Sequence, residues 1–221
     1  MKAMILAAGR GERMRPLTDT TPKPLLKVKG KPLILWHIEK LADSGFHDIV
    51  INIAHLAHKI PQYLGDGSRW GIKLHYSDEQ KEGALESAGG IIKALPLLKD
   101  ETFLVVNGDV WCDYMFDAEF QLQENSLAHL ILVPNPPHNK SGDFALHNTQ
   151  VRNIGEPMYT FSGIGYYSPQ LFEKLPYGKR ALAPLLREAI EKNRVNGELY
   201  NGVWHDIGTP QRLQSINASL C

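Results

Sequence analysis

Branched apolar residues recur along the chain in short runs, separated by polar and glycine-rich segments. Runs of this length and composition are typical of strands that are buried on both faces. We predict such strands at residues 3–6, 49–53, 102–106, 127–133 and 162–167. The pattern therefore indicates a sheet with a hydrophobic layer on each side.

Helical periodicity fills the space between the early strands. Residues 33–44 place Ile34, Ile38 and Leu41 on one face and are followed by Gly45, which favours a helix end. Similar patterns cover residues 87–95 and 182–192. This alternation predicts an α/β fold, with a Rossmann-like, mostly parallel mixed sheet and helices on both faces. The length of 221 residues suits a single domain over 1–221.

The stretch from Pro134 to Tyr159 differs in composition, because it is rich in proline, asparagine, glycine and histidine. Two short strand-like pieces, at residues 144–146 and 151–154, interrupt it. The pattern leaves two alternatives open, a lid over the sheet or a small sheet of its own.

Charge and composition exclude several classes of function. The chain has 24 basic and 24 acidic residues and a pI near 7.1, so it offers no basic face for nucleic acid. No apolar run approaches the roughly 20 residues of a membrane-spanning helix, and the N-terminus lacks the pattern of a signal peptide. Two cysteines, Cys112 and Cys221, are too few for a disulfide framework. We therefore expect a cytoplasmic protein with no nucleic acid or membrane partner.

The segment after the first predicted strand combines glycines with cations. It reads LAAGRGERMRPLT at residues 6–18 and continues with TPKPL at 21–25. Small residues let backbone N–H groups approach a phosphate closely, and Arg13 and Lys23 add charge suited to a pyrophosphate and a reacting phosphoryl group. Taken alone, Gly9 and Gly11 would more often form a tight turn with solvated cations. The segment matches neither a P-loop nor a dinucleotide fingerprint.

Two aspartates stand at the ends of predicted strands. Asp109 ends the run FLVVNGD at 103–109, and Asp206 stands in WHDIGTP at 204–210, where Thr209 and Pro210 predict a helix start. Ligands of open parallel sheets collect at the carboxyl ends of strands. Because Mg²⁺ takes one or two carboxylates together with water and substrate phosphates, this pair suffices for a magnesium site. A turn aspartate that bonds its own backbone is the alternative interpretation of Asp109.

Together these segments resemble the signature of the sugar nucleotidyltransferases, L-A-A-G-x-G-x-R-[ML]-x-P-L-T followed by P-K-P, and every position matches. The likeness covers almost the whole chain. It implies the nucleotide-diphospho-sugar transferase fold, which is GT-A-like, and the joining of a sugar 1-phosphate to a nucleoside triphosphate with release of pyrophosphate. By position, it implies that Ala8 and Gly9 hold the nucleoside, while Arg13 and Lys23 contact the phosphates.

The resemblance also predicts a set of residues for each role. Arg13, Lys23 and Asp109 are expected to be catalytic, and Asp109 and Asp206 to hold Mg²⁺. The expected nucleotide-binding residues are Ala8, Gly9, Gly11, Glu12, Arg13, Lys23, Glu79, Ser87, Gly89 and Asn107. The expected sugar-binding residues are Asn107, Gly142, Asp143 and Glu156. These sets divide the chain into a nucleotide-binding half, about 1–110, and a sugar-binding half, about 111–221.

Two of the resembling segments depart from the family pattern. ALESAGG at 84–90 resembles the L-G-T-A-G segment on which the base rests, but Glu86 replaces the usual glycine, and Ser87 could instead act as a helix cap. IGEP at 154–157 lacks the lysine of the usual E-K-P segment. SGDF at 141–144 takes the place of a Y-G-V-like sugar contact, and FSGI at 161–164 resembles the N-A-G-I strand that closes the sugar pocket.

Within the family, the chain resembles short bacterial enzymes that transfer a uridylyl group from UTP to N-acetylmuramate 1-phosphate in peptidoglycan recycling. We therefore expect these small molecules as partners, Mg²⁺ as cofactor, and a monomer or weak homo-oligomer. The alternatives are a thymidylyl-, guanylyl- or uridylyltransferase of another sugar, a metal-dependent glycosyltransferase and a non-catalytic nucleotide-sensing subunit. Arg13 and Lys23 favour synthesis over glycosyl transfer, and their retention with Asp109 and Asp206 argues against a non-catalytic subunit.

Overall fold

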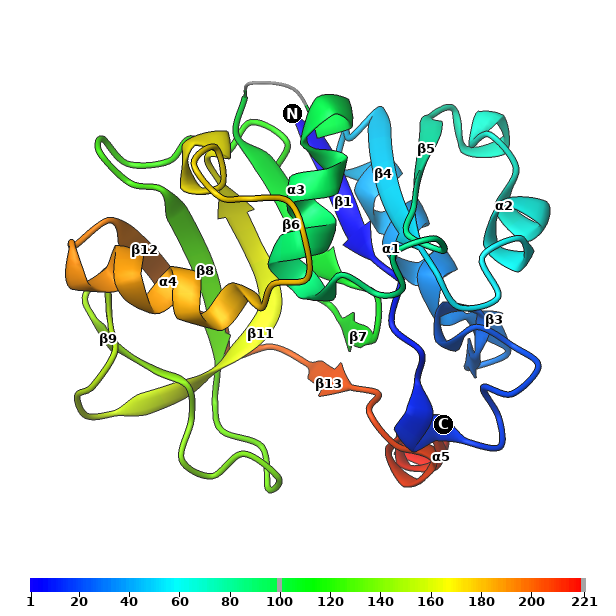
Figure 1. The fold of residues 1–221 in the computed structure, drawn as a ribbon. Coiled ribbons are helices and arrows are strands. Elements are labelled where there is room, and N and C mark those ends of the chain that lie inside the picture. Colours follow the sequence, from blue (N-terminus) through cyan, green and yellow to red (C-terminus); the bar gives the residue numbers. More distant parts are fainter. Residues whose placement is uncertain (99–100, 220–221) are drawn as a thin grey trace.

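The computed structural model describes residues 1–98 and 101–219, and one large twisted sheet runs through it (Figure 1). In spatial order its nine strands are β5 (Lys73–Asp78), β4 (Asp48–Ile53), β1 (Lys2–Leu6), β6 (Phe103–Asn107), β11 (Met158–Tyr167), β8 (Ala128–Val133), β12 (Val195–Leu199), β10 (Gln150–Arg152) and β9 (Phe144–His147). All run in the same direction except β10 and β11. The mostly parallel mixed sheet is therefore confirmed.

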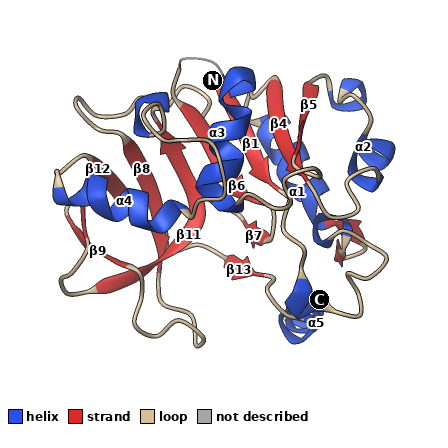
Figure 2. Cartoon of the chain, in the orientation of Figure 1, coloured by secondary structure: helices blue, strands red, loops and turns tan. Residues whose placement is uncertain are grey.

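Helices cover both faces of this sheet (Figure 2). On one face lie α1 (Leu33–Asp43) and α2 (Lys59–Leu64), and on the other lie α3 (Glu86–Leu98) and α4 (Leu182–Glu191). Strand β1 is apolar from Ala3 to Leu6 because helices cover it on both faces. Ala3 and Ile5 pack with α1, whereas Met4 packs with α3, because successive side chains of a strand point to opposite faces. The α/β class is confirmed.

Smaller elements lie around the main sheet. A short hairpin joins β2 (Lys27–Val28) to β3 (Lys31–Pro32), and a separate antiparallel pair joins β7 (Val110–Cys112) to β13 (Trp204–Asp206). Short 3-10 helices span Glu12–Met14, Lys23–Leu25, Ser68–Trp70 and Pro169–Leu171. Helix α5 (Pro210–Ser219) follows β13, as Thr209 and Pro210 predicted, and packs Leu213 and Ile216 against Met14 and Val28. This third apolar cluster ties the end of the chain to its beginning.

The stretch from Pro134 to Tyr159 is neither a lid nor a sheet of its own. Strand β10 pairs with β12, and β9 pairs with both β10 and β11, so the two short strands extend the main sheet. Among the described residues, none forms a helix that is long and apolar enough to cross a membrane. Cys112 is a buried free cysteine, and Cys221 lies outside the described residues.

Candidate active site

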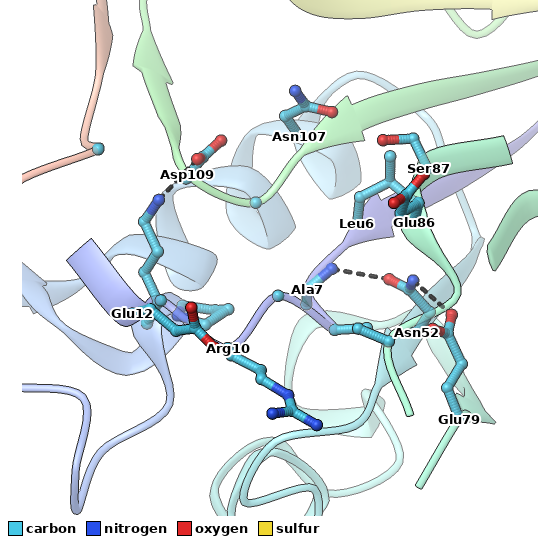
Figure 3. A pocket seen from close by; sticks show the side chains of 18 of the residues that line it. Leu6, Ala7, Arg10, Glu12, Asn52, Glu79, Glu86, Ser87, Asn107 and Asp109 are labelled. Carbon is cyan, nitrogen blue, oxygen red and sulfur yellow. Dashed lines mark hydrogen bonds and ion pairs between the residues drawn. The ribbon is translucent and has the colours of Figure 1, made fainter. Parts of the chain in front are cut away.

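A cavity of about 590 Å³ opens where β1 and β6 end (Figure 3). Most of the residues predicted to bind the nucleotide line it, namely Ala8, Gly9, Gly11, Glu12, Arg13, Lys23, Glu79, Ser87 and Asn107, and so does Asp109. The sequence analysis did not single out four further lining residues, Arg10, Asn52, Gly108 and Gly208. The early loop and the end of β6 therefore face the same space.

The two glycines of the early loop have different roles. Gly11 has a φ of 64°, and an added Cβ would lie 2.8 Å from a methyl group of Thr18. The Thr18 hydroxyl also donates to the Gly11 carbonyl at 2.8 Å, so Gly11 shapes the turn. Gly9 is exposed, and among the described residues nothing lies within 4 Å of a Cβ added there. The backbone at Gly9 is therefore open to a ligand.

A buried polar network fixes this loop to the end of the sheet. Asn52, the penultimate residue of β4, accepts from the Ala7 amide at 2.7 Å and donates to a Glu79 oxygen at 2.7 Å. The other Glu79 oxygen accepts from the Leu85 amide at 2.8 Å. Glu79 is fully buried, and this desolvation raises the pKa of its carboxyl. Asn52 could have been suspected from the sequence, because it is a polar residue within an apolar run.

Within residues 84–90 the structure differs from the prediction at Gly89. Gly89 does not face the nucleotide cavity, since a Cβ on it would lie 2.4 Å from the Gly178 carbonyl oxygen; its lack of a side chain lets residues 178–180 pack on α3. Ser87 lies in the first turn of α3, and its role as a helix cap stays a prediction. Glu86 itself has a φ of 63°, a conformation that costs a non-glycine residue free energy and explains the family's usual glycine there.

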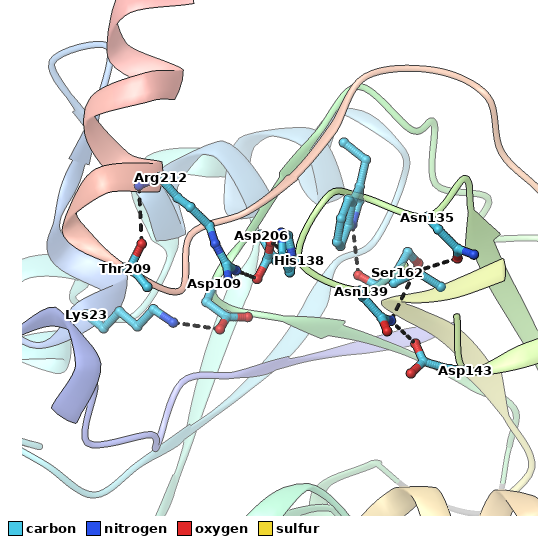
Figure 4. Close-up of polar contacts among 12 residues, drawn as sticks. Lys23, Asp109, Asn135, His138, Asn139, Asp143, Ser162, Asp206, Thr209 and Arg212 are labelled. Carbon is cyan, nitrogen blue, oxygen red and sulfur yellow. Dashed lines mark hydrogen bonds and ion pairs between the residues drawn. The ribbon is translucent and has the colours of Figure 1, made fainter. Parts of the chain in front are cut away.

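The two predicted metal ligands are neighbours across the small β7–β13 pair. Asp206 pairs in register with Val110, and the Ile207 amide donates to the Asp109 carbonyl at 2.7 Å. Lys23 donates to an Asp109 carboxylate oxygen at 2.6 Å (Figure 4). Asp109 is thus held by the predicted lysine, and within residues 1–98 and 101–219 no hydrogen bond joins its carboxylate to its own backbone.

An imidazole and a guanidinium that the sequence did not single out hold Asp206. The imidazole of His138 lies 2.9 Å from one carboxylate oxygen, and the guanidinium of Arg212 donates to the other. Figure 4 shows both side chains beside Asp206. Arg13 reaches the same corner, because a Cβ added to Gly208 would lie 3.6 Å from its guanidinium. Polar side chains from three distant segments, among them the cations Arg13, Lys23 and Arg212, therefore surround the two carboxylates.

A second cavity of about 460 Å³ continues from the first and shares Glu86, Ser87 and Asn107 with it. Of the predicted sugar-binding residues, Asn107 and Asp143 line this space. Gly142 does not line this space. It lies in a turn, where its φ is 67° and a Cβ added to it would lie 2.9 Å from the Tyr159 amide nitrogen. Glu156 is exposed and lines neither cavity.

Asn107 is held at the border between the two cavities by a β-bulge. The register of β11 against β8 shifts between Phe161 and Ile164, and Gly163 in this bulge has a φ of 80°. A Cβ on Gly163 would lie 2.5 Å from the side-chain amide nitrogen (Nδ2) of Asn107. The glycine of the FSGI segment therefore makes room for the Asn107 side chain.

Comparisons with known proteins agree with this geometry. A model of the nucleotidyl transferase family matches residues 2–221. The N-acetylmuramate alpha-1-phosphate uridylyltransferase of Neisseria meningitidis serogroup B is 55% identical over 227 residues, which cover 99% of this chain and 97% of that protein. The UTP--glucose-1-phosphate uridylyltransferase of a Synechocystis species is 43% identical over all of this chain and 63% of its own length.

The fold has a solved counterpart as well. The crystal structure of a protein described as a glucose-1-phosphate thymidylyltransferase from Bacillus anthracis superimposes with a TM-score of 0.86 at 24% identity, covering 99% of this chain and 94% of that one. It shows that the two chains share the nucleotide-diphospho-sugar transferase fold. Together with the family match over nearly the whole sequence, it leads to one conclusion: this chain belongs to the nucleotidyl transferase family of enzymes.

Proposed function

We propose that the protein transfers the uridylyl group of UTP to N-acetylmuramate α-1-phosphate, forming the UDP-activated sugar and pyrophosphate. The observation that carries this proposal is the 55% identity, over nearly the full length of both chains, to an enzyme with that activity. A cell-wall sugar phosphate and UTP meet in the bacterial cytoplasm, so we place the reaction there, in the recycling of peptidoglycan.

The first cavity suits the triphosphate of UTP. Arg13 and Lys23 line it, and the exposed backbone at Gly9 can approach a phosphate oxygen. Arg10 adds a further cation to its rim. These groups supply positive charge where two anionic substrates must come together in line.

A divalent cation, which we propose to be Mg²⁺, fits the two aspartates. Asp109, which directly precedes β7, and Asp206, at the end of the adjacent strand β13, offer hard oxygen donors. Within residues 1–98 and 101–219 no group of three or more His, Cys, Asp or Glu side chains forms a metal cage. That arrangement suits Mg²⁺, which keeps water and substrate phosphates in its coordination sphere. When bound, the ion would neutralise phosphate charge in the transition state.

The chain itself orients the reactants and provides no covalent step in this proposal. A phosphate monoester is already largely dianionic near pH 7, because its second pKa is ~6, so it can attack the α-phosphorus without a general base. Lys23 is only 12% exposed and lies against Asp109, where it can stabilise charge on the reacting phosphates. Asn107 lies between the two cavities and can orient the sugar phosphate.

The test is an assay of pyrophosphate release. Each of UTP, dTTP, GTP and ATP is paired with N-acetylmuramate, N-acetylglucosamine, glucose and mannose 1-phosphates, with Mg²⁺ and with a chelator. We expect UTP with N-acetylmuramate 1-phosphate to give the highest kcat/KM, and the chelator to abolish turnover. A preference for glucose 1-phosphate, the substrate in the name of the 43% identical relative, would overturn the proposed sugar.

Two variants connect this assay to the site. Asp109→Asn and Lys23→Met are each expected to lower kcat by about 100-fold or more, because each removes a charge near the reacting phosphates. Asp43→Asn, at the exposed end of α1, is the matched control and should keep full activity. Near-normal turnover in a folded Asp109 or Lys23 variant would remove that residue from the mechanism.

A further inference from the structure

The second cavity contains a guanidinium that the reaction at phosphorus does not use. We propose that Arg187 binds the lactyl carboxylate of N-acetylmuramate and so selects this sugar over sugars that lack a carboxylate. The inference rests on the proposed function, because it concerns the sugar half of the same substrate pair.

The cavity is placed to receive the sugar. It adjoins the nucleotide cavity through Glu86, Ser87 and Asn107, so a sugar whose phosphate reaches the first space projects into the second. Its other walls are mainly apolar and come from Phe144, Phe161 and helix α4. Arg187 is itself exposed where it lines this space, so a ligand in the cavity can reach its guanidinium.

Arg187 is held at this cavity without being neutralised. Its guanidinium lies 5.1 Å from the centre of the Phe144 ring and donates to the Asp143 carbonyl at 3.4 Å. Within the described part of the chain, it forms no ion pair with a carboxylate. A guanidinium has five N–H donors in a planar fork, so most of them remain available to a ligand.

The charges around the cavity fit a carboxylate ligand at this position. Arg187 is the sole cation among the described residues that line the space. Asp143 already uses one carboxylate oxygen to accept from the Phe161 amide at 2.8 Å and from Asn139 at 3.2 Å. Glu86 lies 3.5 Å from Lys179. Both acidic groups of the lining therefore have partners, whereas Arg187 lacks an anionic one.

The substrate carries the complementary group. N-acetylmuramate is N-acetylglucosamine with a lactyl ether on O3, and the two sugars differ in this group alone. A carboxylate matches the guanidinium fork with two parallel hydrogen bonds, which neither a hydroxyl nor an acetamide does. Comparing the two sugar 1-phosphates therefore isolates the contribution of the lactyl group.

The experiment measures kcat/KM with UTP for both sugar 1-phosphates in three proteins: wild type, Arg187→Met and Arg69→Met. Arg69 is the matched control, because it also stacks on an aromatic ring, Trp70, and donates to a backbone carbonyl, but far from this cavity. We expect Arg187→Met to lower kcat/KM for N-acetylmuramate 1-phosphate on the order of 10- to 100-fold. The value for N-acetylglucosamine 1-phosphate should stay within about twofold of wild type, and Arg69→Met should change neither.

Two contrary results are distinguishable. In the first, wild type prefers N-acetylmuramate 1-phosphate, and Arg187→Met either keeps that preference or loses activity toward both sugars equally. Arg187 then does not bind the lactyl carboxylate, and the proposed function stands. If wild type itself does not prefer N-acetylmuramate 1-phosphate, the proposed sugar is wrong and the inference fails with it.

Discussion

Gly9 and Gly108 line the same cavity, but a methyl group at each position would meet different surroundings. A Cβ on Gly108 would lie 2.6 Å from the Leu6 carbonyl oxygen, whereas one on Gly9 meets nothing within 4 Å among the described residues. We expect Gly108→Ala to destabilise the protein by about 1–3 kcal/mol, because backbone atoms must move apart. Gly9→Ala should keep the stability of wild type and raise the KM for UTP, because the methyl group occupies ligand space.

Thermal unfolding and steady-state kinetics of both variants test this contrast. For a chain of this size, ~1 kcal/mol corresponds to about 2–4 °C in Tm. Equal Tm values for Gly108→Ala and wild type would contradict the close approach of Gly108 to β1. An unchanged KM in Gly9→Ala would contradict a ligand at the loop backbone.

At the residue scale, the sequence was most informative where a motif combined several functional groups. Arg13, Lys23 and Asp109 stand in such motifs and line one cavity. His138 and Arg212 were missed, because each touches Asp206 from a segment whose position depends on the tertiary fold. Periodicity carries no information about such contacts between distant segments.

At the scale of elements, uninterrupted apolar runs predicted strands well, and mixed runs did not. Strand β5 was missed because it is at the sheet edge and has exposed or half-buried polar residues such as Lys73 and His75. Strand β12 was missed because buried Asn196 and Gly197 interrupt its apolar pattern. In both strands, pairing with a neighbour rather than local composition determines the structure.

The hydrogen bonds of Asn52 and Glu79 connect three elements. They join the end of β4 to Ala7, which follows β1, and to Leu85, which precedes α3. Burial raises the pKa of Glu79 in the folded protein above its value in the unfolded chain. Between those two pKa values the folded protein binds more protons, so its stability falls as pH rises through this interval. Glu79→Gln removes the titration. As pH rises above about 4, the ordinary range of a glutamate pKa, the Tm of wild type should therefore fall relative to that of the variant.

Thermal unfolding across this pH range provides the measurement. Glu124→Gln, at an exposed site, corrects for the loss of one carboxylate. The Glu79→Gln variant also loses one of the two hydrogen bonds that the Glu79 carboxylate accepts, so the Tm difference at a single pH mixes two effects. The slope of the Tm difference with pH is therefore the informative quantity. A Tm difference that does not depend on pH, or that changes with the opposite sign, would contradict the buried carboxylate.

At the scale of the whole molecule, the sheet is continuous from β5 to β9 and passes from the first half of the chain to the second where β6 pairs with β11. This continuity favours one domain, while its division into a nucleotide-binding and a sugar-binding half stays a prediction, as does a monomer or weak homo-oligomer. The proposed site lies beside the end of β6, with Lys23 and Asp109 from the first half of the chain and Asp206, in the separate β7–β13 pair, from the second. The proposed reaction therefore requires the two halves of the chain to keep their relative position.

A crystal structure with Mg²⁺ and a UTP analogue whose bridging α,β-oxygen is replaced by carbon tests the central claim most directly. We expect one ion within about 2.0–2.1 Å of oxygens from both Asp109 and Asp206, with the α-phosphate as a further ligand and Arg13 on the triphosphate. An ion that contacts neither aspartate, or a triphosphate bound away from residues 8–13, would contradict the account.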